Sequence, residues 1–144
     1  MRLWHKELIH YLPRQQLLGQ WRECCLIAKS IAQNGTPNHI LVNCILDYPT
    51  IDFVTYSYMV WKEMRDRGYK ADFNKFGKWL DDSDDAIFDC WYLDYDKIFD
   101  TWHNWRYLRE CLYNLEEKYI CGGIPEDDWC RIYNRFGCDF DLYF

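Results

Sequence analysis

The chain has 144 residues, 49% hydrophobic and 28% charged, which favours one folded domain and excludes a disordered or collagen-like chain. Its net charge of -6 is unevenly divided: residues 1–72 carry nine basic and seven acidic side chains, and residues 73–144 carry eight and sixteen. A protein that coats nucleic acid through its overall charge is therefore excluded, and any contact with DNA must be local.

Three segments have the apolar spacing of amphipathic helices, and no segment alternates as a strand would. The first begins at Pro13 and ends before Asn34-Gly35, with one apolar stripe formed by Leu17, Leu18, Trp21, Cys24, Ala28 and Ile31. The second fits residues 51–67 and ends at Gly68. The third fits residues 104–119, and Trp105 lies on its apolar face.

These segments predict an all-α fold in a single domain, residues 1–144, with three main helices and long irregular connections. A short helix is expected after Pro125, followed by an irregular aromatic tail that packs back onto the helices. Between the second and third helices, Asp81–Asp100 holds eight aspartates and one lysine. This segment has two interpretations: a solvated acidic excursion, or an insertion that binds a protein partner or guards a site.

Several features predict the surroundings of the protein. No segment approaches the run of about 18 apolar residues that a membrane span needs, and the N-terminus lacks an apolar signal core. We therefore expect a cytoplasmic protein, monomeric and without membrane contact. The eight cysteines contain no CxxC pair, so we expect reduced thiols, no metal site and no cofactor.

The first helix carries the candidate chemistry. At about 100° per residue, Glu23 points roughly 140° away from the middle of the apolar stripe, and Arg22 and Lys29 lie about 20° apart on one flank. The helix therefore presents an exposed carboxylate beside a small basic ridge. Periodicity alone allows this to be an ordinary polar helix face.

A resemblance gives this face a function. The opening Met1 to His5 (MRLWH), the run Leu12 to Glu23 (LPRQQLLGQWRE), His39 and the end of the second helix at Arg67 to Tyr69 resemble pyrimidine-dimer DNA glycosylases of the phage endonuclease V type and their bacterial relatives. The similarity is good over residues 1–70, weaker over 104–124 and absent over 72–103.

The resemblance implies a DNA repair enzyme that removes a damaged base, with a pyrimidine dimer as the expected lesion, and then cleaves the strand as an abasic-site lyase. The N-terminal amine would attack the sugar C1′ to form a Schiff base. Because Arg2 blocks removal of the initiator methionine, that amine would belong to Met1. α-Amines have a reference pKa of about 7.7–8.0, well below that of lysine, so a neutral fraction exists near pH 7.

The remaining site residues follow from the same resemblance. Glu23 would stabilise the developing sugar cation and assist proton removal. Arg2 and Arg22 would hold phosphates of double-stranded DNA, and Arg14, Lys29 and His39 complete the expected DNA-binding set. Two alternatives stay open: a non-catalytic relative that binds nucleic acid or a protein partner through its acidic, aromatic-rich half, and an enzyme that acts on another modified base.

Overall fold

Four long helices and four short ones make up the part of the chain that the computed structural model describes, residues 1–80 and 95–144. In chain order they are η1 (Lys6–Tyr11), α1 (Arg14–Asn34), η2 (Asn43–Asp47), α2 (Thr50–Asp66), α3 (Asn74–Gly77), η3 (Tyr95–Lys97), α5 (Trp105–Ile120) and α6 (Glu126–Phe140). These residues contain no strand, so the all-α prediction is confirmed. Among them, no helix is long and apolar enough to cross a membrane.

The three predicted helices begin and end within one residue of the expected positions. Helix α1 follows Pro13 and ends at Gly35, which adopts a φ of 75° and donates its N–H to the carbonyl of Ile31. A glycine in this left-handed conformation is a common helix terminator. At the start of α5 the Asn104 side chain accepts a hydrogen bond of 2.9 Å from the Tyr107 N–H, which caps the helix.

The C-terminal prediction is wrong in one respect. The segment expected to hold a short helix and an irregular tail forms the 15-residue helix α6, so the described residues contain four long helices and not three. Trp129, Ile132, Phe136 and Phe140 recur at spacings of three and four, and all four are buried. This is the periodicity of an amphipathic helix, and it extends much further than the short helix expected after Pro125.

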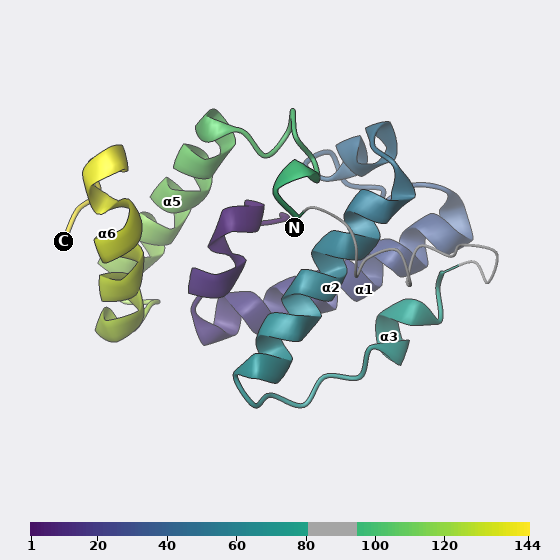
Figure 1. Ribbon diagram of the computed structural model, residues 1–144, viewed down its shortest axis with the longest axis horizontal. Helices are drawn as coiled ribbons and strands as arrows, with labels where there is room; N and C mark the ends of the chain where they lie inside the picture. The colour runs from purple at the N-terminus through teal and green to yellow at the C-terminus, as the bar shows by residue number, and fades with distance from the viewer. Residues whose placement is uncertain (81–94) are drawn as a thin grey trace.

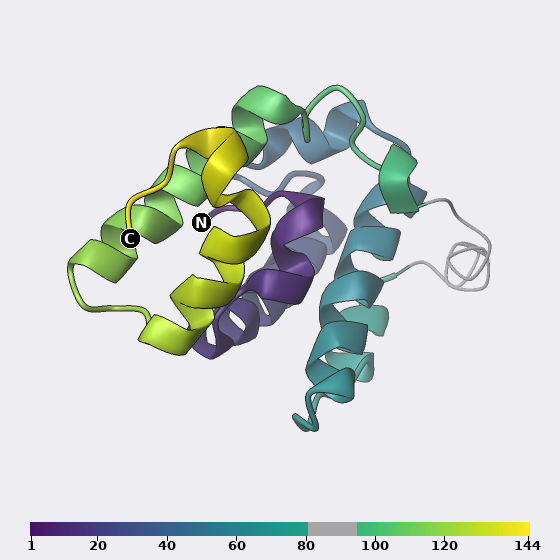
Figure 2. The same cartoon turned by 60° about the vertical axis from the view of Figure 1, so that its left-hand side comes forward.

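The helices form two groups joined by the N-terminal segment. Helix α1 packs against α2 and α3, and α5 packs against α6. The short helix η1 contacts both α2 and α6 and so bridges the two groups. Figures 1 and 2 show α5 and α6 at one end of the molecule and the α1–α2 pair at the other, with η1 between them.

Two expectations about side-chain exposure need correction. Trp105 was expected on the inward face of its helix, but it is 60% exposed and stacks on Phe140 of α6, with ring centroids 4.3 Å apart. In the predicted acidic insertion, residues 81–94 lie outside the described residues. Ile98 and Phe99, however, are buried in the core, and the Phe99 N–H donates to the Asp52 carboxylate at 3.1 Å. The last residues of the acidic segment therefore belong to the folded core.

Candidate active site

The N-terminus lies between the two helical groups (Figure 1). Chain termini usually fray unless other parts of the protein hold them. Here the amides of Arg2, Trp4 and Lys6 donate to the side chains of Glu23, Gln20 and His103, at 3.2, 2.7 and 2.9 Å. The first residues are thus fixed by side chains from α1 and from the segment that leads into α5.

The carbonyl groups of the same segment are held as well. Gln20 Nε2 donates to the Arg2 carbonyl at 3.0 Å, Tyr56 donates to the Trp4 carbonyl at 2.6 Å, and Tyr107 donates to the Leu3 carbonyl. Burial raises the pKa of the Tyr56 and Tyr107 hydroxyls above their ordinary value, so both remain protonated and able to donate. The carbonyls of residues 2–4 and the amides of Arg2 and Trp4 are therefore all hydrogen-bonded.

Gln20 connects these contacts, and sequence reasoning missed it. Its side chain is 1% exposed, accepts from the Trp4 N–H and from Tyr56, and donates to the Arg2 carbonyl. A polar residue between Leu17 and Cys24 on the buried side of α1 is the signal that could have identified it. Buried polar side chains are hydrogen-bonded in most folded proteins, so such a residue points to a specific partner.

Glu23 is half-buried, whereas the helix geometry alone predicted an exposed carboxylate. The difference arises because the N-terminal segment lies over this side of α1. Glu23 Oε2 accepts from the Arg2 N–H at 3.2 Å and lies 3.4 Å from Gln20 Nε2. Within the described residues no ion pair neutralises Glu23, although Arg22 is its neighbour.

The Arg2 contact fixes how far the N-terminal amine can lie from Glu23. The Met1 nitrogen is separated from the Arg2 nitrogen by three covalent bonds, which span at most about 3.7 Å. Since the Arg2 nitrogen is 3.2 Å from Glu23 Oε2, the amine of Met1 lies within about 7 Å of that oxygen. Met1 is itself exposed, so the amine of an accessible residue lies close to a half-buried carboxylate.

The Arg2 side chain turns away from solvent. Its guanidinium carbon is 6.0 Å from the ring centroids of both Trp4 and Tyr107, and the group also contacts the Cys111 thiol. These are cation–π distances, so aromatic rings stabilise the charge of Arg2 in this structure. The structure brings the Arg2 backbone to Glu23 but directs the Arg2 side chain toward α5.

The other predicted DNA-binding residues spread along α1 and the loop that follows it. Arg14, Arg22 and Lys29 are all exposed and span about 22 Å of the helix axis. The Arg14 guanidinium lies over the Tyr69 ring at 5.3 Å, and the Lys29 ammonium lies 5.8 Å from Trp79. His39 is half-buried in the loop between α1 and η2, where its ring accepts from the Leu41 N–H at 3.2 Å.

Arg22 lines a basic groove that the sequence alone did not predict. A hollow of about 340 Å³ is lined by Arg22 and Leu26 of α1 and by Lys70, Asp72 and Lys75. Its three cations outnumber its one carboxylate. Lys70 lies in the connection between α2 and α3, and Lys75 lies in α3 itself, so only the packing of α3 against α1 brings them to Arg22. Clustered cations of this kind attract phosphates.

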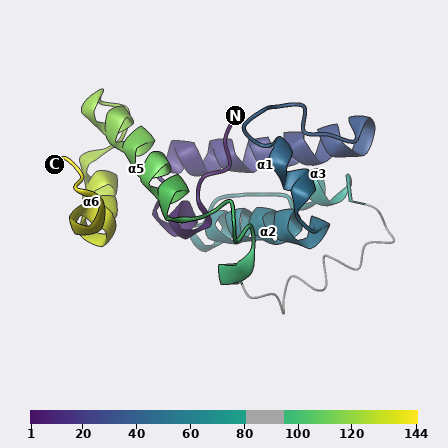
Figure 3. The same cartoon turned by 90° about the horizontal axis from the view of Figure 1, so that it is seen from above.

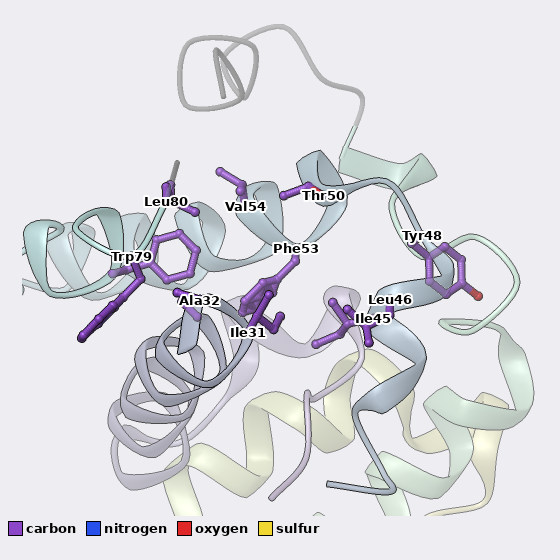
Figure 4. A pocket seen from close by; sticks show the side chains of 12 residues that line it. Ile31, Ala32, Ile45, Leu46, Tyr48, Thr50, Phe53, Val54, Trp79 and Leu80 are labelled. Atoms are coloured by element: carbon purple, nitrogen blue, oxygen red, sulfur yellow. The ribbon is translucent and has the colours of Figure 1, made fainter. Parts of the chain in front are cut away.

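A second hollow has a different character. It has a volume of about 300 Å³ and lies between α1, α2, α3 and η2, with mainly apolar side chains such as Ile31, Phe53, Phe76 and Trp79 (Figure 4). No titratable group other than Tyr48 lines it, and the Tyr48 hydroxyl is bonded to Thr101. Elsewhere in the described residues, no three His, Cys, Asp or Glu side chains gather as a metal would require.

A buried pair of histidines, His5 and His103, packs at the N-terminal segment, and His103 accepts from the Lys6 N–H. The rings of His5 and His103 stack with centroids 5.0 Å apart. Burial lowers the pKa of His5 to about 4 and holds that of His103 well below its ordinary value, so both rings are neutral near pH 7. Next to them, Lys6 Nζ donates to the carbonyls of Asp96 and Ile98, the latter at 2.6 Å.

Comparison with known proteins identifies a family. The family model of the pyrimidine dimer DNA glycosylases matches residues 1–76, slightly more than half of the chain. Curated proteins and solved structures gave no match. The matched region contains Met1, Gln20, Arg22, Glu23 and the basic groove. The chain therefore belongs to the pyrimidine dimer DNA glycosylase family, which makes it a DNA repair glycosylase with damaged DNA as its substrate.

Proposed function

We propose that the protein removes the damaged base of a pyrimidine dimer and then cleaves the DNA strand, with the amine of Met1 as the nucleophile. The observation that carries this proposal is the hydrogen bond from the Arg2 N–H to Glu23, which keeps the adjacent amine within about 7 Å of a half-buried carboxylate. Six backbone contacts of residues 2–6 hold this arrangement before DNA binds. A preformed geometry of this kind lowers the entropic cost of the reaction.

In the first step the neutral amine of Met1 attacks C1′ of the damaged nucleotide. The bond between C1′ and the base breaks, and the base takes a proton from the amine. The sugar ring then opens: the C1′–O4′ bond breaks, O4′ takes up a proton from water, and the C1′–nitrogen bond becomes a protonated Schiff base. In the second step a proton leaves C2′ and the 3′ phosphate departs with the electrons of its C–O bond, which cleaves the strand. Water then hydrolyses the Schiff base and releases the amine.

Glu23 acts in both steps. Its negative charge stabilises the positive charge that develops on the sugar and on the Schiff base, and its free lone pairs accept the C2′ proton. The Arg2 N–H and Gln20 Nε2 both contact Oε2, so they orient the carboxylate toward the N-terminus. Partial burial strengthens the charge stabilisation, because water screens the carboxylate less than it would on an open helix face.

The two lysines that could compete as nucleophiles are less well placed. Lys6 Nζ is engaged by two backbone carbonyls, and Lys29 lies over Trp79, about 9 Å along α1 from Glu23. Arg22, with Lys70 and Lys75 in the basic groove, supplies phosphate contacts beside the site. Because the Arg2 side chain lies over aromatic rings, we assign the principal phosphate contact to Arg22.

Borohydride trapping on a duplex with a single abasic site tests the proposal. Reduction of a Schiff base leaves a covalent protein–DNA adduct, and mass spectrometry of its peptides identifies the attached nitrogen. We expect the adduct at the amine of Met1. An adduct on a lysine would refute the assignment of the nucleophile, and absence of any adduct would favour a relative that only binds DNA.

Two variants sharpen this experiment. A protein extended by two residues before Met1 should bind the duplex but lose trapping, because its amine is displaced from Glu23. Glu23→Gln should keep the fold and lose strand cleavage, since the amide still accepts from the Arg2 N–H but carries no charge. Lys6→Ala and Lys29→Ala are the matched controls, and both should still trap.

A further inference from the structure

The loop between α1 and η2, residues 35–42, presents an apolar tip to solvent. Ile40 is 87% exposed, the largest exposure of any large apolar side chain among the described residues, and the adjacent Leu41 is 51% exposed. A single exposed apolar residue needs no explanation, but two consecutive ones at the tip of a loop are costly in water. Such a tip is therefore a candidate for contact with a ligand.

The loop is ordered by its own hydrogen bonds. Asn43 Oδ1 accepts from the His39 N–H at 2.9 Å, and the His39 carbonyl accepts from the amides of Val42 and Asn43 at 3.0 and 2.9 Å. Asn38 adopts a φ of 57°, in the left-handed region that asparagine tolerates better than most residues. These contacts close a tight turn around residues 39–43, so Ile40 is presented in a fixed position.

The same loop runs back along α1 toward the N-terminus. Ser30 Oγ donates to the Thr36 carbonyl at 2.7 Å, which places the start of the loop on the Ser30 face of α1. Glu23 lies on this face too, about 20° around the helix from Ser30 and about 10 Å along it. Figure 3 shows the loop after α1 returning over the helix to the neighbourhood of the N-terminus, and Figures 1 and 2 agree.

The neighbouring face of α1 carries exposed cations. Arg22 and Lys29 are exposed there, and between them Leu26 is exposed as well. Charges that attract phosphates beside an apolar projection are typical of proteins that bend or open a duplex, because the cations hold the backbones while the apolar residue enters the base stack.

We propose that Ile40 and Leu41 form a wedge that enters the DNA base stack beside the damaged nucleotide and fills the space left when the lesion is opened. This inference rests on the proposed function and concerns the opening of the duplex, which precedes base removal. The nucleophile cannot reach C1′ inside a closed duplex, so the duplex must first be opened at the lesion. An apolar side chain held on this loop, which passes near the N-terminus, stabilises the opened state, because it replaces lost stacking contacts with its own.

Single-turnover base removal on two duplexes tests the wedge. Both carry one cyclobutane pyrimidine dimer, which is opposite two adenines in the first duplex and opposite an unpaired gap in the second. Ile40→Ala should slow base removal about tenfold on the paired duplex and less than about twofold on the open one, because the gap removes the need for a wedge. Leu46→Ala is the control, because Leu46 lies on η2 and is as exposed as Leu41. This variant should match the wild type on both duplexes.

A fluorescence measurement tests the wedge independently of catalysis. With 2-aminopurine beside the dimer, binding of the wild type should raise the emission by unstacking, and Ile40→Ala should raise it much less. A wild-type protein that unstacks the duplex without cleaving it would refute the proposed function and support the wedge. An Ile40→Ala variant that unstacks and cleaves like the wild type, or that is equally slow on both duplexes, would overturn the wedge alone.

Discussion

Replacing Gln20 by leucine tests whether a single buried side chain holds the N-terminus in place. Leucine has a similar volume but cannot hydrogen-bond. The substitution removes the acceptor of the Trp4 N–H at 2.7 Å and the donor to the Arg2 carbonyl at 3.0 Å. The Tyr56 hydroxyl loses one contact to Gln20 but keeps its bond to the Trp4 carbonyl.

The expected cost follows from the groups left without partners. A buried donor with no acceptor costs about 1–3 kcal/mol, and the Trp4 N–H is such a group. The Arg2 carbonyl is only partly covered, so it adds less. We expect Gln20→Leu to lower the free energy of unfolding by about 2–3 kcal/mol, or the melting temperature by about 5–10 °C. Borohydride trapping should slow about tenfold or more, because the amine is no longer held near Glu23.

Gln16→Leu provides a matched control. It is the same substitution one turn earlier on α1, but Gln16 Oε1 is buried without a hydrogen-bond partner. Its removal should leave the stability unchanged or raise it. Urea unfolding and trapping rates of the two variants measure the difference. Equal stabilities for Gln20→Leu and Gln16→Leu would refute the role of Gln20.

Three further predictions concern pH, salt and charge. The free energy of unfolding should fall as the pH drops from about 6.5 to about 4, because His5 and His103 bind protons in the unfolded chain but not in the folded one. The lowered pKa of His5 alone accounts for roughly 3 kcal/mol. Urea titrations with equal midpoints at pH 7 and pH 4.5 would contradict this. Arg22→Ala should reduce the slope of log affinity against log salt by about one, whereas altered lesion preference at unchanged affinity would exclude a phosphate contact. Changing the six aspartates within residues 81–94 to asparagine brings the net charge from -6 to 0 and should tighten non-specific DNA binding, measured by fluorescence anisotropy; unchanged affinity would show that these charges do not face DNA.

Local signals in the sequence determined most of the helical framework. Pro13, Gly35 and Gly68 mark helix ends through their own backbone preferences, so α1 and α2 were predicted within one residue. The candidate catalytic pair of Met1 and Glu23 was also accessible, because a family motif is carried by residue identities and their order. The apolar spacing of residues 126–140 is sufficient to predict helix α6, although their aromatic composition favours an irregular tail.

Only the tertiary structure decided how the site is held. The exposure of Glu23 depends on a segment 21 residues away that lies over it, and helix periodicity carries no information about such a cover. The contacts of Tyr56 and Tyr107 with the N-terminal backbone join residues 52 and 104 positions apart, and either hydroxyl could equally have faced solvent. The burial of Ile98 and Phe99 at the end of an acidic segment has the same origin. Local sequence fixes the conformation of each helix, but which side chains meet depends on how the helices pack, and that is a property of the whole chain.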